Sequence, residues 1–300
     1  MFVQAKYLEK ILITGHSGFL AQALIKSLKQ KYELIGISRK NFDSDIVNIK
    51  KDIRKINIKD IPEDVNCIIH LAGLTDVYYC QENSSKCFDV NVGGTQNMLE
   101  IAKQRKSKFI FISSSHIYGN PKKLPILETQ KAKPISNYAY SKLNSEILCE
   151  SYSKNYNLDV SIARIFSVYG PASPPHHVIT KIIKNLINKE KIKLGNLFPK
   201  RDFIYIQDVV SAIEILVKKT NGFNIYNIGT GNSSSISDLI EILSKITNKN
   251  AEIETDISKI RKNEVKEIRS DISKMIKLGW KPKYDLNKGL KLTVKQILKN

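Results

Sequence analysis

The segment from Ile11 to Ala21, ILITGHSGFLA, constrains the fold of this chain more than any other stretch. Its apolar start predicts a buried strand, and the residues after the second glycine begin an amphipathic helix. Gly15 permits a tight turn, Gly18 lets backbone approach a pyrophosphate, and small Ala21 permits close packing of helix on strand. This order near the start of the chain indicates a phosphate-binding turn, and an ordinary glycine turn is the alternative.

Strand-like and helix-like patterns alternate after this turn. Strands are predicted at Glu9–Thr14, Tyr32–Ser38, Asn66–Ala72, Lys108–Ser113 and Leu158–Ile165, and helices at about Gly18–Lys31, Ser84–Lys106 and Asn137–Tyr156. Such alternation predicts an α/β protein with a Rossmann-type, doubly wound parallel sheet that helices cover on both faces.

The pattern changes near Tyr169, where the segment YGPASPPHH is rich in Pro and Gly and predicts a loop. Shorter elements follow: helices at about Val178–Asn188, Gln207–Lys218, after Ser237 and at Asn287–Leu298, and a strand at Lys191–Gly195. We therefore expect a dinucleotide-binding domain over residues 1–170, with a return segment near 202–220. A smaller, discontinuous α/β substrate-binding lobe is expected over residues 171–201 and 221–300.

The composition excludes some function classes. The formal net charge is +19, but the cations are mostly Lys and are spread along the chain, which favours a solvated surface over a nucleic-acid-binding patch. No apolar run approaches the roughly 18 residues of a membrane span, and Met1–Lys10 lacks a secretory signal. The four cysteines form no close-spaced pair of the zinc or redox kind, so we expect reduced thiols in a cytoplasmic protein, and no metal site.

The end of the second predicted strand, Ile35–Lys40, is where a dinucleotide-binding fold selects its cofactor. A carboxylate that would accept from the ribose hydroxyls of NAD is missing there, and two cations, Arg39 and Lys40, are present. Cations suit the 2′-phosphate of NADP, so NADP(H) is predicted over NAD(H). A solvated basic turn is the alternative.

A second group of residues has the chemistry of proton transfer. The serine-rich segment Ser113–Gly119 follows a predicted strand, and Tyr138 and Lys142 lie four apart on one face of a predicted helix. An ammonium beside a phenol favours the phenolate and lowers a pKa that is ordinarily about 10. The tyrosine can then exchange a proton with a sugar hydroxyl or carbonyl oxygen, which a serine holds while a nicotinamide exchanges hydride.

With these motifs the chain resembles the extended short-chain dehydrogenase/reductases, the NAD(P)-dependent epimerase/dehydratase family of nucleotide-sugar enzymes. The resemblance also rests on HLAG at His70–Gly73, NVGGT at Asn91–Thr95, RIFSVYGP at Arg164–Pro171, RDFIYIQD at Arg201–Asp208, YNIGTG at Tyr226–Gly231, RKNEV at Arg261–Val265 and LGWKP at Leu278–Pro282. It covers nearly the whole chain and is far more specific for the family than for a substrate. It implies a nucleotide-sugar substrate and a homodimer in which the helices near Ser84–Lys106 and Asn137–Tyr156 form a four-helix bundle.

The resemblance implies a role for each matching residue. The catalytic positions are Ser114, Tyr138 and Lys142. The cofactor-binding positions are Gly15, Ser17, Gly18, Phe19, Leu20, Ser38, Arg39, Lys40, Asp52, Ile53, Leu71, Ala72, Gly73, Asn91, Ile112, Tyr138, Lys142 and Phe166. The substrate-binding positions are Ser115, His116, Ser167, His177, Arg201, Arg261 and Glu264. Arg201 and Arg261 would grip the substrate diphosphate, for which the planar fork of Arg is better suited than Lys.

Three departures from the family pattern bear on the reaction. Dehydratases of the family usually carry Asp-Glu where this chain has Ser115 and His116, so dehydration is disfavoured. Many members have Asn at the position of Ser167, and an NAD-type carboxylate is absent at Ser38. His116 and His177 match places where GDP-fucose synthases carry a second proton-transfer pair. A pocket-lining His and a solvent-exposed His are the favoured alternative.

We expect hydride transfer at the sugar, with reduction of a 4-keto nucleotide-sugar by NADPH as the first choice. The alternative is a nucleotide-sugar 4-epimerase of the UDP-glucose 4-epimerase kind with tightly bound NAD. Both reactions use the same Ser/Tyr/Lys triad, so cofactor choice separates them. A non-catalytic dinucleotide sensor or nucleic-acid binder would lack Tyr138 or Lys142, and this chain has both.

Overall fold

The computed structural model of the chain describes residues 9–40, 46–188, 191–250, 252–257 and 265–299. The chain folds into two compact units, each built from segments that are far apart in the sequence. Unit 1 comprises residues 1–117, 136–163 and 213–225, and unit 2 comprises residues 118–135, 164–212 and 226–300. It stays a prediction that one domain binds the dinucleotide and that the smaller lobe binds the substrate.

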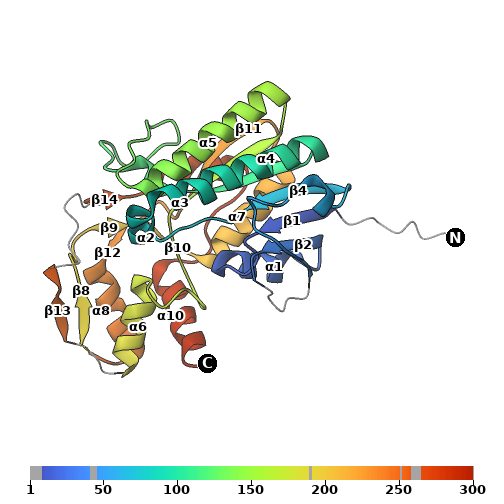
Figure 1. Cartoon of the computed structure of the whole chain (residues 1–300). Helices are drawn as coiled ribbons and strands as arrows, with labels where there is room; N and C mark the ends of the chain where they lie inside the picture. The colour runs from blue at the N-terminus through green and yellow to red at the C-terminus, as the bar shows by residue number, and fades with distance from the viewer. Residues whose placement is uncertain (1–8, 41–45, 189–190, 251, 258–264, 300) are drawn as a thin grey trace. The chain divides into compact units, whose positions relative to one another are not determined.

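A seven-stranded sheet organises the fold, in the order β11-β6-β5-β4-β1-β2-β3 (Figure 1). β1 pairs in parallel with both β2 and β4, and the β2–β3 and β4–β5 pairs are also parallel. Strand order therefore reverses direction beside β1, and α/β proteins bind ligands at the carboxyl ends of the strands at such a switch point. The strands are β1 (Lys10–Thr14), β2 (Glu33–Ser38), β3 (Val47–Lys50), β4 (Val65–His70), β5 (Lys108–Ser114), β6 (Val160–Ile165) and β11 (Phe223–Ile228).

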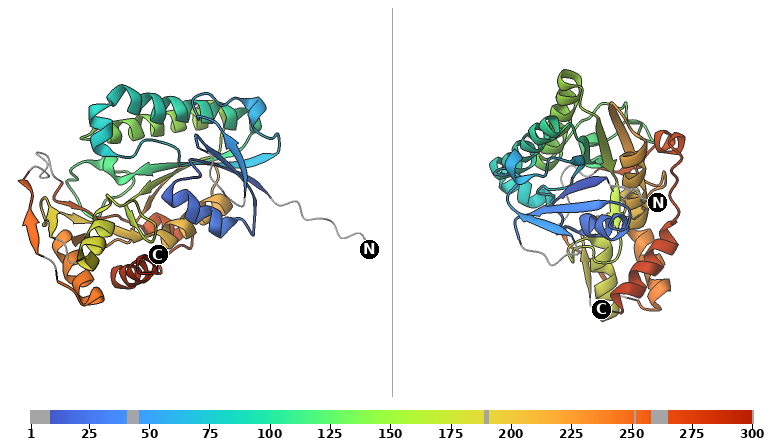
Figure 2. Two further views of the ribbon diagram at one scale, coloured as in Figure 1. Left: turned by 60° about the horizontal axis from the view of Figure 1, so that its bottom comes forward. Right: turned by 90° about the vertical axis from the view of Figure 1, so that its right-hand side faces the viewer.

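Helices cover both faces of this sheet (Figure 2). α4 (Gly94–Arg105) and α5 (Asn137–Tyr156) lie side by side on one face, and α1 (Phe19–Leu28) lies on the other. Because both faces are covered, the strands read as continuous apolar runs rather than alternating ones. The core of unit 1 includes the buried side chains of Leu12, Ile68, Met98, Leu99, Phe109, Phe111 and Ile162.

α5 has the bounds that its sequence pattern predicts. The Ser136 side chain caps its start by accepting a hydrogen bond from the amide of Ala139, and Asn157 ends it in a left-handed conformation with φ of 53°. The helix predicted over Ser84–Lys106 is instead divided into α3 (Ser84–Phe88), a π-helical segment (Asp89–Gly93) and α4. Hydrophobic periodicity does not signal such a π segment, which often marks a functional site.

Unit 2 contains shorter elements. α6 (Val178–Asn188) and α10 (Leu286–Ile297) both pack against α8 (Ile236–Thr247). Small sheets complete the unit: β10 (Phe203–Tyr205) pairs with β7 (Ser167–Tyr169), β13 (Ile253–Thr255) with β8 (Ile192–Leu194), and β9 (Lys200–Arg201) with both β12 (Ser234–Ser235) and β14 (Glu267–Ile268). α9 (Ser273–Lys277) also belongs to unit 2, α2 (Val77–Glu82) belongs to unit 1, and α7 (Ile206–Lys219) has residues in both units.

The predicted Rossmann-type fold is confirmed by the strand order and by the helices on both faces. The sequence patterns did not predict β3, β7 or any of the strands from β9 to β14. All four cysteines are buried free thiols. Within the described ranges, no helix combines the length and the apolar character that a membrane span requires.

Candidate active site

The predicted phosphate-binding turn joins β1 to α1 in unit 1. Gly15 has a φ of +68°, and a Cβ there would lie 2.9 Å from the Cα of Ala72, so only glycine fits. The Gly15 amide donates to the carbonyl of Ile37 at 2.8 Å, and the Gly18 amide donates to the carbonyl of Gly15 at 2.9 Å. Gly18 caps α1 without a side-chain hydrogen bond. A helix N-terminus that no side chain caps, beside a glycine turn, is suited to a pyrophosphate.

The other predicted residues of this turn surround it. Ser17 and Gly18 are exposed, and Phe19 and Leu20 are half-buried at the start of α1. Leu71, Ala72 and Gly73 are also half-buried and follow the end of β4. The structure therefore brings these predicted cofactor-binding residues together at the switch point between β1 and β4.

A buried histidine braces this edge of the sheet. His70 bonds through Nδ1 with the Thr14 hydroxyl at 2.8 Å and through Nε2 with the Thr95 hydroxyl at 3.1 Å. The Ala72 amide donates to the Thr14 hydroxyl at 3.1 Å, which continues the network into the loop after β4. Burial lowers the pKa of His70 to about 3, so the ring is neutral. The sequence motif HLAG contained His70 but gave no role for it.

Asn91, in the π-helical segment, is a second bracing residue. Its side-chain amide accepts from the Leu74 amide at 2.7 Å, donates to the Leu74 carbonyl at 3.0 Å and donates to the Ser141 hydroxyl at 2.8 Å. A Cβ on Gly73 would lie 2.9 Å from the Asn91 Oδ1. Asn91 thus links the loop after β4 to α5, and its support of the cofactor site stays a prediction.

The predicted adenine end of the site lies at the ends of β2 and β3. The Ser38 hydroxyl donates to the carbonyl of Lys40 at 2.5 Å, and Arg39 and Lys40 are both exposed. Asp52 forms an ion pair with Arg54 at 2.6 Å, and hydrogen bonding to Arg54 lowers the pKa of Asp52 to about 2. Ile53 is buried against the position of Gly94.

The three predicted catalytic residues meet in unit 1, where β5 ends beside α5. Ser114, Tyr138 and Lys142 are 7%, 7% and 4% exposed, and Ser114 is near enough to Tyr138 for its hydroxyl to lower the pKa of the phenol. Lys142 Nζ donates to the carbonyl of Ile112 at 2.8 Å and lies 4.8 Å from the centre of the Phe111 ring. The spacing of four on a helix and the end of a neighbouring strand are sufficient to bring this set together.

The charge state of Tyr138 differs from the sequence-based expectation. Burial raises the pKa of the Tyr138 phenol to about 12, and the Ser114 hydroxyl only partly opposes this. Burial also lowers the pKa of Lys142 to about 8. The phenol is therefore neutral, because it is desolvated and the Lys142 ammonium is directed at the Ile112 carbonyl.

Ser115 and His116 follow the catalytic serine in a short 3₁₀ turn, Ser115–Tyr118. Ser115 is buried, whereas His116 is exposed. The His116 ring lies edge-on to the Tyr138 ring, with ring centroids 5.7 Å apart. His116 is therefore next to the predicted proton donor.

The remaining predicted residues belong to unit 2. Phe166 is buried and Ser167 is half-buried at the start of β7. His177 is half-buried beside His176, and burial lowers the pKa of His177. Arg261 and Glu264 lie outside the described residues.

Arg201 and its neighbour Asp202 have different environments. Arg201 Nη1 donates to the carbonyls of Lys200 and Val265, each at 2.9 Å. Asp202 is fully buried, and its carboxylate accepts from Thr230, Gly231 and Ser270. Asp202 therefore organises the loops of unit 2, a role that the sequence motif did not reveal.

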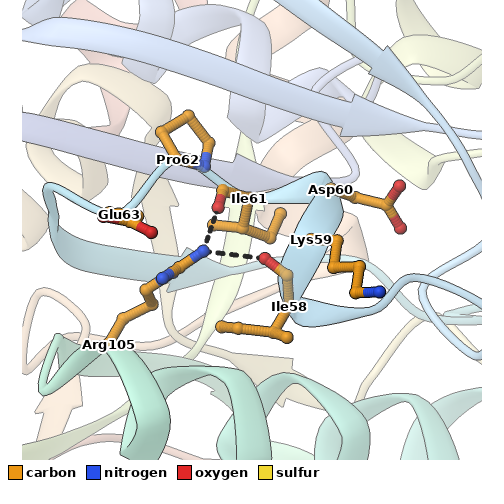
Figure 3. Close-up of a pocket in the computed structure, with 7 residues that line it drawn as sticks. All are labelled: Ile58, Lys59, Asp60, Ile61, Pro62, Glu63 and Arg105. Atoms are coloured by element: carbon orange, nitrogen blue, oxygen red, sulfur yellow. Dashed lines mark hydrogen bonds between the residues drawn. The ribbon is translucent and has the colours of Figure 1, made fainter.

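A hollow elsewhere in unit 1 is lined by charged residues and is separate from the triad. Figure 3 shows Arg105, at the end of α4, donating to the carbonyls of Ile58 and Ile61. The other residues that line it are Lys59, Asp60, Pro62 and Glu63. The fork of Arg105 has a structural role here, because it satisfies carbonyl groups of a loop that contains a 3₁₀ turn, Ile58–Asp60.

Comparison with known proteins places these features in one family. Residues 11–229 match the model of the NAD dependent epimerase/dehydratase family. A putative UDP-glucose 4-epimerase of Methanocaldococcus jannaschii is 33% identical, over 97% of this chain and 99% of that protein. A GDP-6-deoxy-D-mannose reductase of Pseudomonas aeruginosa is 28% identical, over 94% of this chain and 95% of that protein.

Among solved structures, the chain is similar to the UDP-glucuronic acid 4-epimerase of Bacillus cereus in complex with UDP-glucuronic acid and NAD. The two chains are 30% identical with a TM-score of 0.90, and the match covers 97% of this chain and 99% of that one. The structural match therefore includes both the predicted phosphate-binding turn and unit 2.

These findings correct the predicted cofactor. The preference for NADP(H) over NAD(H) is wrong, because the family is NAD-dependent and the similar epimerase structure holds NAD. The two cations that carried the prediction, Arg39 and Lys40, are exposed on a turn. In a chain with a net charge of +19, exposed cations at one turn do not discriminate a phosphate site from a solvated surface.

Proposed function

Because this chain belongs to the NAD dependent epimerase/dehydratase family and is an enzyme of nucleotide-sugar modification, we propose that it is a nucleotide-sugar 4-epimerase that uses NAD. The observation that carries the proposed hydride and proton transfer is the burial of both Ser114 and Tyr138, with Lys142 one helical turn further along α5. Similarity to the putative UDP-glucose 4-epimerase and to the UDP-glucuronic acid 4-epimerase supports the choice of reaction.

The residues of unit 1 fit NAD. Gly15 and Gly73 leave room that a Cβ would fill, against Ala72 and Asn91 respectively. The N-terminus of α1 would receive the pyrophosphate, Asp52 and Ile53 would border the adenine, and Lys142 would hold the nicotinamide ribose. When bound, NAD would supply the acceptor and donor of hydride at C4 of the sugar.

The triad supplies the proton transfers that epimerisation needs. Ser114 would hold the C4 oxygen, and Tyr138 would take its proton during oxidation and return it during reduction. Since burial raises the pKa of Tyr138 to about 12, positive charge beside the ring is needed before the phenol works as a base. Lys142 is the cation that the chain itself provides on that face of α5.

The test is to incubate the purified enzyme with UDP-glucose and with UDP-glucuronic acid, without added reductant, and to separate the 4-epimers chromatographically. We expect an equilibrium mixture of the two epimers from at least one substrate. Mass spectrometry of the nucleotides that co-purify should find NAD. Enzyme that holds NAD but forms no epimer from any nucleotide-sugar would refute the proposal.

Reduction of a 4-keto nucleotide-sugar was the first expectation from the sequence. Its support was the predicted NADP site, which the comparisons contradict. One observation still favours it, namely the similarity to a GDP-6-deoxy-D-mannose reductase. A second incubation, with a 4-keto nucleotide-sugar and reduced nicotinamide nucleotide, separates the reactions, because a reductase consumes one equivalent of reduced nicotinamide for each sugar and an epimerase consumes none.

For unit 2 we propose that Arg201, Arg261 and Glu264 hold the diphosphate and ribose of the nucleotide, and that Ser167 and His177 are further substrate-binding residues. Arg201→Lys should weaken UDP binding about 10- to 100-fold, since a charged hydrogen bond contributes about 1.5–3 kcal/mol. Calorimetric titration with UDP measures this. A variant that melts earlier yet binds UDP unchanged would assign Arg201 a purely structural role.

We further propose that the enzyme is a homodimer in which α4 and α5 of each subunit form a four-helix bundle. Tyr140 and Ile147 support this, because they lie seven residues apart on α5 and are 49% and 55% exposed. Large apolar side chains repeated every two turns are typical of a helix face that pairs with other helices.

A further inference from the structure

Two neighbouring hydrogen bonds join the end of β5 to α5 beside the triad. Lys142 Nζ donates to the carbonyl of Ile112 at 2.8 Å, and the Ser113 hydroxyl donates to Oε1 of Glu146 at 2.5 Å. Consecutive residues of the strand thus meet residues one turn apart on the helix. Lys142 belongs to the triad, whereas the reaction proposed above has no use for Ser113 or Glu146.

The burial of Glu146 is unusual for its residue type. Glu146 and Ser113 are both 4% exposed, while Glu150, one turn further along α5, has a side chain that is 44% exposed and pairs with Lys154 at the surface. A carboxyl group in the interior is costly unless it is hydrogen-bonded, so its place has to be held by specific partners. The partner that the strand provides is the hydroxyl of Ser113.

Ser113 immediately precedes Ser114, whose hydroxyl lies near Tyr138 and lowers the pKa of its phenol. Glu146 lies eight residues after Tyr138 on the same helix, which is about 12 Å along its axis. The hydrogen bond between Ser113 and Glu146 therefore fixes the position of the end of β5 along the axis of α5. It therefore sets the separation of the Ser114 hydroxyl from the Tyr138 phenol without touching either one.

We propose that Ser113 and Glu146 are positioning residues, whose hydrogen bond holds the end of β5 in register with α5 and so keeps Ser114, Tyr138 and Lys142 in a productive arrangement. This inference rests on the proposed function for its catalytic consequence. The charges around Lys142 agree with it. Burial lowers the pKa of that ammonium, whereas Cys149 and Glu146 act in the opposite direction.

The chain offers a matched control for this bond. Ser107 directly precedes β5 at its other end, is fully buried, and donates from its hydroxyl to the Val65 carbonyl at 2.5 Å. Ser113→Ala and Ser107→Ala each remove one buried hydroxyl bond of the same length, the first within β5 and the second at the residue that precedes it. Only the first lies next to the triad, so a loss of stability alone affects both variants alike.

The experiment measures kcat, KM and the melting temperature of these variants, together with Ser113→Thr. We expect Ser113→Ala to lower kcat about 10- to 100-fold with KM nearly unchanged, because small misplacements of reacting groups have effects of this size. Ser113→Thr keeps the hydroxyl and should recover most of kcat. Ser107→Ala should keep the kcat of the wild type. Equal kcat in the two alanine variants, or no recovery with threonine, would overturn the proposal.

A second measurement does not depend on turnover. Lys142 is bonded to Ile112, so a displaced strand end also displaces the group that would hold the nicotinamide ribose. Calorimetric titration of nucleotide-free protein with NAD should give weaker binding for Ser113→Ala than for Ser107→Ala. If the wild type turns over no nucleotide-sugar, the proposed function fails, while this comparison still decides the positioning role. Equal NAD affinities would overturn that role.

Discussion

Tyr138 illustrates how burial and function combine at a single residue. Its phenol is almost inaccessible, has a pKa raised to about 12 by burial, and touches Ser114 on one side and the edge of His116 on another. A phenol with so high a pKa is neutral and is a proton donor rather than a base. The phenol becomes a base only when positive charge lies beside it. The Lys142 ammonium and the nicotinamide ring of bound NAD would supply that charge, so proton transfer would depend on a bound cofactor.

Tyr138→Phe should abolish most turnover while the fold and NAD binding persist. The substitution removes one hydroxyl, and a positioned acid or base contributes about 10²- to 10⁴-fold to the rate. Tyr140→Phe is the matched control, because Tyr140 is on the same helix but is 49% exposed. Steady-state rates of both variants check the prediction. Comparable losses in the two variants would exclude Tyr138 as the proton carrier.

Alanine substitution at two glycines can distinguish the cost of a left-handed backbone from a steric clash at the predicted cofactor site. Gly15 and Gly222 have φ values of +68° and +64°, but a Cβ would meet Ala72 at Gly15 and nothing within 4 Å at Gly222. Gly222→Ala should cost about 1–2 kcal/mol of stability from the left-handed conformation alone and leave NAD affinity unchanged. Gly15→Ala should add a clash and lose NAD binding. Denaturation and NAD titration of both variants measure this, and equal NAD affinity would contradict the predicted turn.

The residues of the site differ in how well the sequence predicts them. Glycines, the triad and Asn91 follow from motifs, because each needs a particular residue type at a particular spacing. Arg39 and Lys40 led to the wrong prediction of NADP(H), because positive charge on an exposed turn says little about a phosphate site in a chain this basic. His70, Asp202 and the Ser113–Glu146 bond depend on partners far away in the sequence, which no local pattern reveals.

At the scale of elements, His70 at the carboxyl end of β4 should make the free energy of unfolding depend on pH. Burial lowers the pKa of His70 to about 3, whereas an unfolded histidine titrates near about 6.5. The unfolded state therefore binds the proton first, so this contribution is complete above about pH 6.5 and is lost progressively as the pH falls towards 3.

His70→Gln should flatten this pH dependence. Between about pH 6.5 and pH 5 the wild type should lose about 2 kcal/mol more of its free energy of unfolding than the variant. Urea denaturation at several pH values measures the difference. His176→Gln removes an exposed ring and is the control. A wild type and His70→Gln that lose stability in parallel would show that His70 is charged in the folded state.

The proposed homodimer can be tested by a substitution on the exposed face of α5. Ile147→Lys places a charge on the exposed apolar face of the helix and should dissociate the dimer, whereas Phe198→Lys, at an 81% exposed position in unit 2, should not. Light scattering should give twice 34.1 kDa for the wild type and the control, and 34.1 kDa for Ile147→Lys. A wild-type monomer at micromolar concentration would refute the bundle.

Elements with strong local signals were predictable. α5 and α6 have the predicted bounds. α6 has a strong apolar periodicity, whereas α5 is bounded by the Ser136 cap and by Asn157 in a left-handed conformation. The π segment at Asp89–Gly93 was not, since its irregularity is stabilised by Asn91 and its contacts to other elements. β11 is formed by a late segment that joins the sheet beside β6, and such long-range pairing leaves no mark in local sequence.

At the scale of the whole molecule, the motifs identified the family, while the reaction depends on how a shared triad is used. A reductase ends after one hydride transfer, and an epimerase returns the hydride to the same carbon. The chemistry of Ser114, Tyr138 and Lys142 serves both, so no residue of the triad discriminates between them. The fate of the hydrogen at C4 does.

The most direct measurement is therefore isotopic. The enzyme is incubated with UDP-glucose or UDP-glucuronic acid that carries deuterium at C4, with no added nicotinamide nucleotide, and the products are analysed by mass spectrometry and NMR. We predict that the 4-epimer forms and keeps its deuterium at C4, because bound NAD holds the hydride between the two transfers. Product that has lost the label, or product that forms only when NADH or NADPH is consumed in equal amount, would contradict the account.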